Sequence, residues 1–392
     1  MKAFKVRVYP NKQQEKFIRK QVGTGRAIYN KTIAYKKEAY DKYKDDKELL
    51  KEKSKVNYPK WYDDMPWMRE LDTRGFVQDI QNVHSAYSNF FKSIKGARAG
   101  KRVGYPTFKK RGNRGSYSVC GKRALGIDEE TKRITVGKLN DNPRSKKRLG
   151  TLKYRDTSDR DMSGSVTTVT ISFNPAQQFF ASLNIEKETQ DVEIKKGDKI
   201  IGFDMKFENN GGGFVNSEGN YIAFPKPFKD MLGRLRIEQR KLSKMVGNKK
   251  GEKKSNHYLT QSKKINIMHN RIKNQREDFL HKLSTELVEE YDVIVLETLN
   301  LQGMAKSRFG KNVSELGWNK FITMLEYKGK EKGATIYKVP WNFPSSKTCS
   351  KCGYINKDLK LGDRNWKCVC GTELDRDVNA AKNLVNYYKN NQ

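Results

Sequence analysis

The sequence predicts a multidomain α+β protein, and three changes of pattern along the chain lead to this prediction. Short apolar segments with strand-like alternation dominate from Val103 to Ile185, which is typical of a small β-barrel. Long helical stretches and buried strands follow from Lys199 onward. Four cysteines then gather between residues 349 and 370 of the 392-residue chain. At roughly 150 residues per domain, this length allows two or three domains.

The first hundred residues predict one strand followed by helices. Residues 3–9 alternate between apolar and polar side chains, which is the pattern of a half-buried strand. Asn11 and Gln14 resemble a capping box, so a helix should begin there and continue to about Tyr43. Apolar side chains recur at helical spacing over Thr73–Ile94, which predicts a second helix.

The next region predicts short strands: Tyr105–Phe108, Ser116–Val119, Ile134–Val136, Val166–Phe173 and Phe179–Ile185. The N-terminal strand should join them in the barrel, so that residues 11–100 form a helical insertion. Residues 187–197 are a polar, charged linker, which places a domain boundary near residue 195.

The remainder predicts a mixed sheet with helices. Ile200–Asp204 and Val293–Glu297 each form a continuous apolar run that ends on an acid, as expected of a buried strand. The other elements are helices at about 227–247, 257–290 and 315–331, strands at Phe214–Ser217, Tyr221–Phe224 and Thr335–Val339, and a final helix that starts near Asp377.

The composition predicts a polyanionic partner. The chain has 80 basic and 45 acidic residues, a net charge of +35, and a pI near 9.8. This balance favours nucleic acid, with a ribosome-associated or merely soluble basic protein as the alternative. No apolar run approaches the roughly 18 residues of a membrane span, and the N-terminus lacks a secretory apolar region. We therefore expect a protein that is neither inserted in a membrane nor secreted, and that does not bind membranes, as in a cytoplasmic location.

Basic residues gather in two clusters. The first comprises Lys92, Lys95, Arg98, Lys101, Arg102, Lys109, Lys110, Arg111 and Arg114, and the second Lys249, Lys250, Lys253, Lys254, Lys263 and Lys264. Aromatic residues interleave with the first cluster, as expected where phosphate neutralisation accompanies base stacking. A solvated face is the alternative interpretation for either cluster.

The cysteines predict a structural zinc site. Cys349 and Cys352 form one pair, and Cys368 and Cys370 form a second pair after a gap of fifteen residues. A glycine follows each pair and permits a tight turn. Four thiolates complete the tetrahedral shell of zinc and leave no open position for a reactant. The remaining Cys120 stands alone and is expected to be a buried apolar residue.

Three acids predict a second metal site. Asp204 and Glu297 end buried strands and should lie at one end of a sheet, while Asp377 begins a helix. Taken singly, each could be a turn former or a helix cap. Together they are the hard ligands that magnesium or manganese prefers, and two such ions can promote phosphodiester displacement. Asp375 competes with Asp377 for the third position.

These motifs resemble the TnpB family, RNA-guided nucleases encoded by insertion sequences and considered ancestral to type V CRISPR effectors. The resemblance covers nearly the whole chain. It rests on four segments in this order: Phe4–Asn11, Gly104–Lys109, Pro344–Gly353 and Asp375–Leu384.

The resemblance implies a division into four domains. A wedge β-barrel would comprise residues 1–10 and 101–195 and would carry a helical recognition domain at 11–100. A RuvC-like, RNase H-type nuclease domain would comprise 196–343 and 374–392, interrupted by a zinc ribbon at 344–373.

The resemblance also implies the chemistry. Asp204, Glu297 and Asp377 match the three catalytic acids, which would bind Mg²⁺ or Mn²⁺. The partners would be a noncoding guide RNA from the transposon end and double-stranded target DNA, with the protein acting as a monomer. The segment after Asp204 departs from the family pattern, as does the Cys-x-Cys pair.

The family reads a short motif that flanks its DNA target. Arg74 and Gln78 are four residues apart, hence on one helix face, and suit guanine and adenine, respectively. A phosphate clamp or a solvated pair is the alternative. Lys109, Lys110 and Arg111 are further candidates for nucleic-acid contact.

Two other functions compete with RNA-guided cleavage. An RNA-guided repressor would bind DNA without cutting it, but such relatives have lost the acids that this chain retains. A DNA-strand transposase of the tyrosine type would require a nucleophilic tyrosine beside a histidine pair, and no His-x-His sequence occurs here. The sequence therefore favours an RNA-guided DNA endonuclease.

Overall fold

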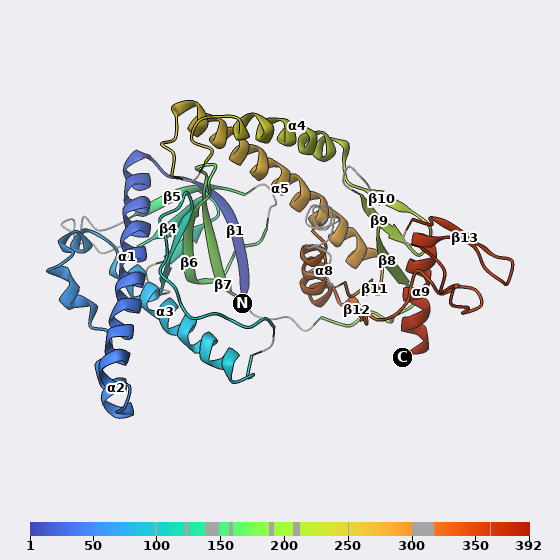
Figure 1. Ribbon diagram of the computed structural model, residues 1–392, viewed down its shortest axis with the longest axis horizontal. Coiled ribbons are helices and arrows are strands. Elements are labelled where there is room, and N and C mark those ends of the chain that lie inside the picture. Colours follow the sequence, from blue (N-terminus) through green and yellow to red (C-terminus); the bar gives the residue numbers. More distant parts are fainter. Residues whose placement is uncertain are drawn as a thin grey trace. The chain divides into compact units, whose positions relative to one another are not determined.

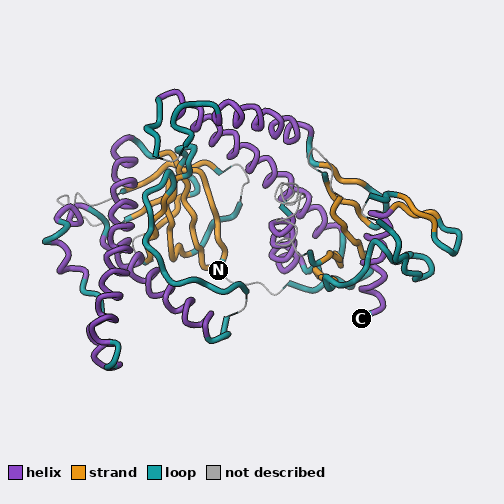
Figure 2. Tube along the Cα trace, in the orientation of Figure 1, coloured by secondary structure: helices purple, strands orange, loops and turns teal. Residues whose placement is uncertain are grey.

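The computed structural model describes residues 1–98, 100–121, 125–137, 149–156, 160–187, 192–206, 212–249, 251–299, 317–360 and 362–392. The chain divides into two compact units, Met1–Thr189 and Gln190–Gln392 (Figures 1 and 2). Each unit combines helices and sheet, so the prediction of a mixed α+β multidomain protein is confirmed. No helix of the described residues is both long and apolar enough to cross a membrane.

The sheet of the first unit has seven antiparallel strands. They are β1 Lys2–Tyr9, β2 Gly115–Cys120, β3 Leu125–Asp128, β4 Arg133–Val136, β5 Gly150–Arg155, β6 Ser165–Phe173 and β7 Phe179–Glu186. The spatial order is β2-β6-β7-β1-β5-β4-β3. Thus β1 joins the sheet between β7 and β5, with Phe4, Val6 and Val8 in the core. The edge strand β3 also contacts β6, so the sheet curls.

Helices form the other part of this unit. They are α1 Lys12–Tyr43, α2 Lys47–Lys53, the 3-10 turns η1 Tyr58–Tyr62 and η2 Pro66–Glu70, and α3 Thr73–Ile94. The capping box is present, because the Asn11 side chain accepts from the Gln14 amide and the Gln14 side chain accepts from the Asn11 amide. Ile28, Trp61 and Phe76 share one core, which holds α1, η1 and α3 together.

One predicted strand is wrong. Tyr105–Phe108 has no sheet partner and is anchored by side chains instead. The amide of Lys109 donates to Asn30 Oδ1 at 2.8 Å, and Asn30 Nδ2 donates to the Lys109 carbonyl at 3.0 Å. The Tyr105 hydroxyl lies 3.1 Å from that of Tyr87. The alternation in this segment therefore reflects contacts with helices α1 and α3.

The second unit is built on a five-stranded sheet. Its strands are β8 Ile200–Lys206, β9 Gly213–Asn216, β10 Tyr221–Ala223, β11 Val293–Glu297 and β12 Thr335–Val339. The order is β10-β9-β8-β11-β12. The three strands β8, β11 and β12 run parallel, whereas β9 and β10 are antiparallel additions beside β8.

Helices cover both faces of this sheet (Figure 1). They are α4 Lys226–Ser243, α5 Asn256–Glu290, α8 Trp318–Lys332 and α9 Arg376–Asn390. Alternate residues of β11 face opposite layers: Ile294 packs in the core with α4, α5 and α8, while Val293 and Val295 pack with Leu384 and Tyr388 of α9. This double burial explains why the strand is a continuous apolar run.

Helix α9 approaches β8 at a glycine. A Cβ built on Gly202 would lie only 2.3 Å from the carbonyl oxygen of Ala381. Any side chain larger than the hydrogen of glycine at this position would therefore force α9 to move.

Gly202→Ala is expected to destabilise the protein by about 1–3 kcal/mol, the usual range for overpacking. Gly233→Ala is the matched control, because a Cβ on Gly233 in α4 meets nothing within 4 Å and alanine is the better helix former. Urea unfolding midpoints measure both changes. Equal midpoints for Gly202→Ala and the wild type would contradict the close approach.

Candidate active site and metal centre

Strand alternation places two of the predicted acids on the face that α9 covers. Phe203 of β8 is buried with the α4, α5 and α8 layer, so its neighbour Asp204 lies on the opposite face. The same alternation after Val293 and Val295 places Glu297 on the α9 side. Leu296 is in parallel register with Phe203, and the two acids are the next residues of their strands. The fold therefore sets them side by side.

The third acid comes from the first turn of α9. Asp377 precedes Ala381 by four residues, so both lie on one face of the helix, and Ala381 is the residue that contacts Gly202. The Asp377 side chain is buried, with 5% of the residue exposed. Asp375 has a different role, because its Oδ1 caps the helix by accepting from the amides of Asp377 and Val378 at 3.0 and 2.9 Å.

The three carboxylates interact electrostatically. The pKa of Asp204 is raised well above its ordinary value, first by burial and then by the charges of Glu297 and Asp377. Burial also raises the pKa of Glu297 and of Asp377. A cluster of acids that resists ionisation in this way is stabilised by a cation, and three carboxylates suit a hard divalent ion.

Cations that the sequence analysis did not identify surround Asp377. Arg364 Nη1 lies 3.1 Å from Asp377 Oδ2, and Lys206 Nζ lies 4.0 Å from the same oxygen. The charges of Arg364, Lys206 and Arg376 oppose the rise that burial causes in the pKa of Asp377. Lys206 follows Asp204 by two residues on the same strand face, so alternation could have identified it. No spacing pattern marks Arg364, which enters from a separate loop.

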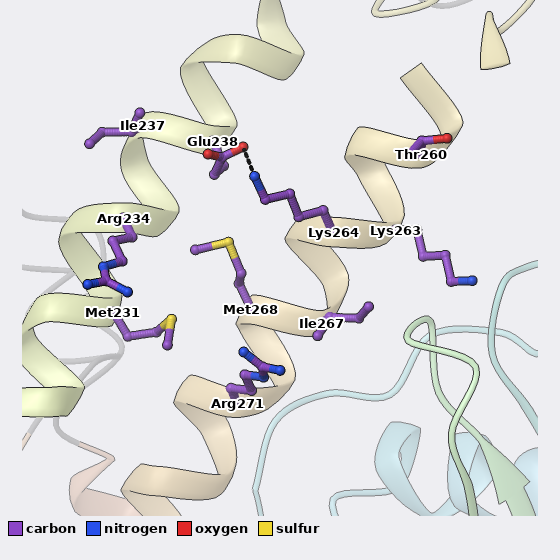
Figure 3. Close-up of a pocket in the computed structure, with 10 residues that line it drawn as sticks. All are labelled: Met231, Arg234, Ile237, Glu238, Thr260, Lys263, Lys264, Ile267, Met268 and Arg271. Carbon is purple, nitrogen blue, oxygen red and sulfur yellow. Dashed lines mark ion pairs between the residues drawn. The ribbon is translucent and has the colours of Figure 1, made fainter. Parts of the chain in front are cut away.

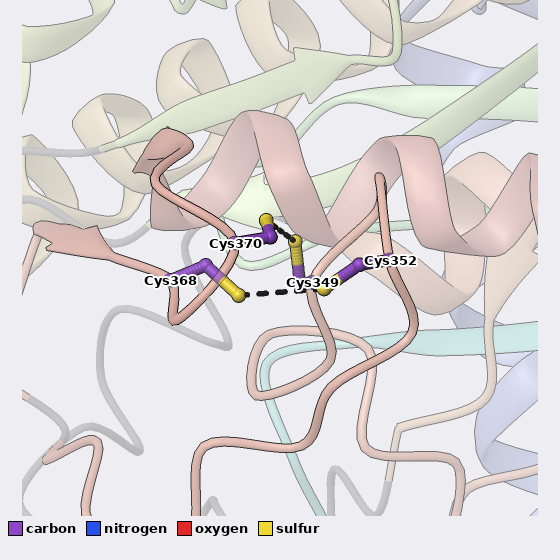
Figure 4. Close-up of side chains that lie close together, drawn as sticks. All are labelled: Cys349, Cys352, Cys368 and Cys370. Atoms are coloured by element: carbon purple, nitrogen blue, oxygen red, sulfur yellow. Dashed lines mark hydrogen bonds between the residues drawn. The ribbon is translucent and has the colours of Figure 1, made fainter.

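The four cysteines converge as a metal site would require (Figure 4). All four sulfur atoms lie within 4.8 Å of one another, with Cys349 Sγ 3.9 Å from Cys370 Sγ and Cys352 Sγ 3.5 Å from Cys368 Sγ. Sulfurs at about 2.3 Å from a tetrahedral zinc would be roughly 3.8 Å apart. In the described part of the chain, no other group of three or more such ligands meets the same limit. The residues therefore fit zinc.

The glycines after the two cysteine pairs complete the turns. Gly353 and Gly371 have φ of 78° and 82°, a region that favours glycine. The amide of Gly353 donates to the Cys349 carbonyl and that of Gly371 to the Cys368 carbonyl, both at 2.9 Å. These bonds fold each pair into a knuckle that points its thiols inward.

Asparagines of α9 fasten the segment before the first cysteine pair. The Asn379 amide group donates to the Thr348 carbonyl at 2.7 Å, and its Oδ1 accepts from the Ser350 amide at 2.9 Å. Asn383 donates to the Ser345 carbonyl at 2.7 Å. Both asparagines are buried, so these bonds are costly to lose. The cysteine-bearing segment and the helix that carries Asp377 are thus one hydrogen-bonded assembly.

That assembly continues directly into the acid. Strand β13 Asn365–Lys367 pairs with β14 Glu373–Asp375, and α9 begins at the next residue, Arg376. Folding of the two cysteine knuckles therefore helps to fix the position of Asp377.

Arg74 and Gln78 lie at the start of α3. The Arg74 guanidinium binds Asp72 through two bonds, of 3.0 and 2.6 Å. Gln78 donates to Asn82 Oδ1 at 3.3 Å and accepts from Cys120 Sγ at 3.2 Å. The prediction that Cys120 is buried is wrong, because it is exposed at the end of β2 beside α3.

The three basic residues after Phe108 differ in their contacts. The Lys109 ammonium lies 3.7 Å from the centre of the Tyr29 ring, and burial lowers its pKa. Lys109 therefore helps to attach its segment to α1. Lys110 and Arg111 are exposed. Lys250 lies outside the described residues, as do residues 207–211 of the segment 205–213 that departs from the family pattern.

Three family descriptions match this chain. "Probable transposase" matches residues 184–308, "Cas12f1-like, TNB domain" matches 318–384, and "Helix-turn-helix domain" matches 1–45. The second of these spans the cysteine knuckles and Asp377.

Similar proteins match this chain, two of them along nearly its whole length. A "Putative RNA-guided DNA endonuclease" of Streptomyces pristinaespiralis is 28% identical, over 98% of this chain and 88% of that protein. The "Putative RNA-guided DNA endonuclease InsQ" of Escherichia coli K12 is 26% identical, over 98% and 92%. A mimivirus "TnpB-like protein L79" is 27% identical over 56% of this chain and 42% of that protein.

The fold is also similar to that of a solved structure. The protein in "Cryo-EM structure of the Cas12f1-sgRNA-target DNA complex" has a TM-score of 0.56 at 17% identity, covering 95% of this chain and 82% of that one. The sequence matches and this fold agree with the motifs quoted above. The chain is therefore similar to insertion-sequence OrfB and Cas12f1-like proteins over three segments, and to proteins named as putative RNA-guided DNA endonucleases along nearly its whole length.

Proposed function

We propose that this protein is an RNA-guided DNA endonuclease that cleaves double-stranded DNA by metal-dependent hydrolysis. The observation that carries the proposal is that Asp204 and Glu297 belong to the sheet face that α9 covers, while Asp377 belongs to the first turn of α9. The charges of Glu297 and Asp377 add to burial in raising the pKa of Asp204. A repressor would not need three acids near one another, one of them buried and two half-buried. The names of the full-length relatives support the same activity.

The proposed domains follow the two units. The curled sheet with β1 would be the wedge barrel, and α1 to α3 would be its recognition insertion. The sheet of β8, β11 and β12 with its antiparallel extension would be the RuvC-like domain, and the cysteine knuckles its zinc ribbon. The strand order β10-β9-β8-β11-β12 supports an RNase H-type assignment.

The three acids would hold Mg²⁺ or Mn²⁺. The ions would supply the charge that stabilises the attacking and leaving oxygens of the phosphodiester. The chain's own contribution is the rigid frame: β8 and β11 fix Asp204 and Glu297, while the Asp375 cap fixes the first turn of α9. Arg364 and Lys206 bring positive charge to Asp377, where an anionic DNA backbone would approach.

Guided cleavage requires an RNA. Protein purified from its natural host is expected to carry a structured noncoding RNA, since +35 of charge favours a resident polyanion. Nuclease-treated protein should cut a matched plasmid only after that RNA is restored. Equal cutting without RNA would refute the guided mechanism, and binding without any cutting would favour the repressor.

Arg74 and Gln78 are proposed to read the target-flanking motif. Arg74→Ala should change the base preference in a cleavage assay on a randomised library, because losing one bidentate base contact costs about 1–3 kcal/mol at that position. Lys110→Ala is the control, since an exposed lysine would contact phosphate and lower cleavage without changing the profile. An unchanged profile for Arg74→Ala would make Arg74 a phosphate contact.

A further inference from the structure

A groove lies between helices α4 and α5, apart from the acidic site. Its volume is about 610 Å³. Figure 3 shows Arg234 and Glu238 on α4 opposite Lys264 and Arg271 on α5, while Lys263 extends from the other side of α5. Four of these five charged residues are basic, so the groove presents a positive surface.

The single acid in the lining does not neutralise the groove. Glu238 already binds Lys264 at 3.0 Å, Lys241 at 3.2 Å and Gln261 at 2.7 Å. These bonds hold its pKa at about 2, so it stays ionised and fastens α4 to α5. Its charge is thus committed within the protein.

Three basic residues of the lining are left for a ligand. Arg234, Lys263 and Arg271 are exposed, and none of them forms an ion pair with a described residue. Arg234 and Arg271 lie between the two helices, whereas Lys263 lies on the other side of α5 (Figure 3), so only an extended anion can reach all three. Such an anion relieves the repulsion between the like charges. The free energy gained is large only if the anion reaches all three.

The spacing of these residues selects a polymer. Lys263 and Arg271 are eight residues apart on α5, hence roughly 12 Å along the helix, and Arg234 lies across the groove. One phosphate cannot contact such separated groups, whereas a strand with a phosphate on every nucleotide can. The separation of these basic residues therefore excludes a single free nucleotide as the ligand that contacts all of them.

The floor of the groove is apolar. It is lined by Met231, Ile237, Ile267 and Met268, and Ile237 is 54% exposed. Thioether and branched aliphatic groups adapt to irregular surfaces, and they can pack against riboses and base faces while the cations bind the phosphates between them. A floor of this kind would be unfavourable to leave in water.

We propose that the α4–α5 groove binds the backbone of the guide RNA, in a single-stranded or loop segment. This inference rests on the proposed function, which requires an RNA that stays bound while DNA targets come and go. An RNA that stays bound neutralises Arg234, Lys263 and Arg271 at all times. It also keeps the apolar floor of the groove covered.

The test compares two triple variants of the full-length zinc-loaded chain. The groove variant carries Arg234→Gln, Lys263→Gln and Arg271→Gln. The control carries Lys330→Gln, Lys382→Gln and Lys389→Gln, which removes the same charge from exposed residues of α8 and α9. The probe is the RNA recovered from purified wild-type protein, end-labelled, and its affinity is measured at several salt concentrations.

The groove variant is expected to bind this RNA at least about tenfold more weakly, with a salt slope smaller by about 2, because each lost phosphate contact on a single strand removes about 0.7. The control variant should change the affinity far less. Wild-type affinity and slope in the groove variant would overturn the proposal. So would a loss confined to single-stranded DNA of the same sequence, since the groove would then be a DNA site.

A photocrosslinking amino acid at position 237 locates the ligand directly. Irradiation of the purified complex should attach RNA to the groove, whereas the same amino acid at the exposed Val369 should not. Crosslinking of DNA rather than RNA to position 237 would contradict the assignment of the groove to RNA. A DNA-cleavage assay on the same protein separates this inference from the proposed function. If RNA crosslinks to the groove of a protein that does not cut DNA, the proposed endonuclease activity is refuted and the RNA site is not.

Discussion

Asp204→Asn is expected to abolish cleavage of a matched plasmid while leaving RNA-guided DNA binding intact. The substitution keeps the size of the side chain but removes a charge that two cations would need. Asp204 has the central place, because its pKa responds to both Glu297 and Asp377. Plasmid cleavage and a gel-shift assay on the same preparations measure the two activities separately.

Asp375→Asn is the matched control for this prediction. Asparagine can cap a helix as well as aspartate does, so α9 should begin at the same residue and most activity should remain. Calcium should support binding with little cleavage, because its coordination is looser than that of magnesium. Full activity in Asp204→Asn would refute the assignment of the site.

Loss of zinc should have the second large effect. Cys349→Ser or a chelator is expected to lower the free energy of unfolding of the ribbon by several kcal/mol, because zinc binding is coupled to folding in such sites. Cleavage should fall in parallel, since β14 leads directly to the helix of Asp377. Elemental analysis should find about one zinc per chain in the wild type.

Cys120→Ser is the control for the zinc prediction. Cys120 is exposed and remote in sequence from the other four cysteines, so its replacement should leave zinc content and unfolding unchanged. A chelator-treated protein with unaltered melting and cleavage would exclude a structural zinc.

Local patterns predicted most elements because each pattern has a direct physical cause. The capping box placed the start of α1, and helical spacing placed α3 at Thr73–Ile94. Tyr105–Phe108 failed because extended backbone needs a neighbouring strand to become sheet, and side chains from α1 and α3 hold it instead. Sequence alternation alone does not identify the partner.

The candidate site divides in the same way. Asp204 and Glu297 could be found because each directly follows a continuous apolar run, although β8 continues past Asp204 to Lys206. Asp377 could be found because it stands in a family motif. Arg364 could not be found, since its contact with Asp377 depends on how the cysteine-bearing segment folds back. The groove of α4 and α5 also depends on which helix faces meet, which periodicity does not specify.

The position of α9 along the chain has a consequence for biosynthesis. This helix packs Leu384 and Tyr388 against Val293 and Val295, and its first turn carries Asp377. A growing polypeptide therefore leaves this apolar sheet face without its covering helix until α9 has left the ribosome, and it holds only two of the three acids until then. Under the proposed function, a nascent chain that has not yet formed α9 is unable to cleave DNA, because it lacks Asp377.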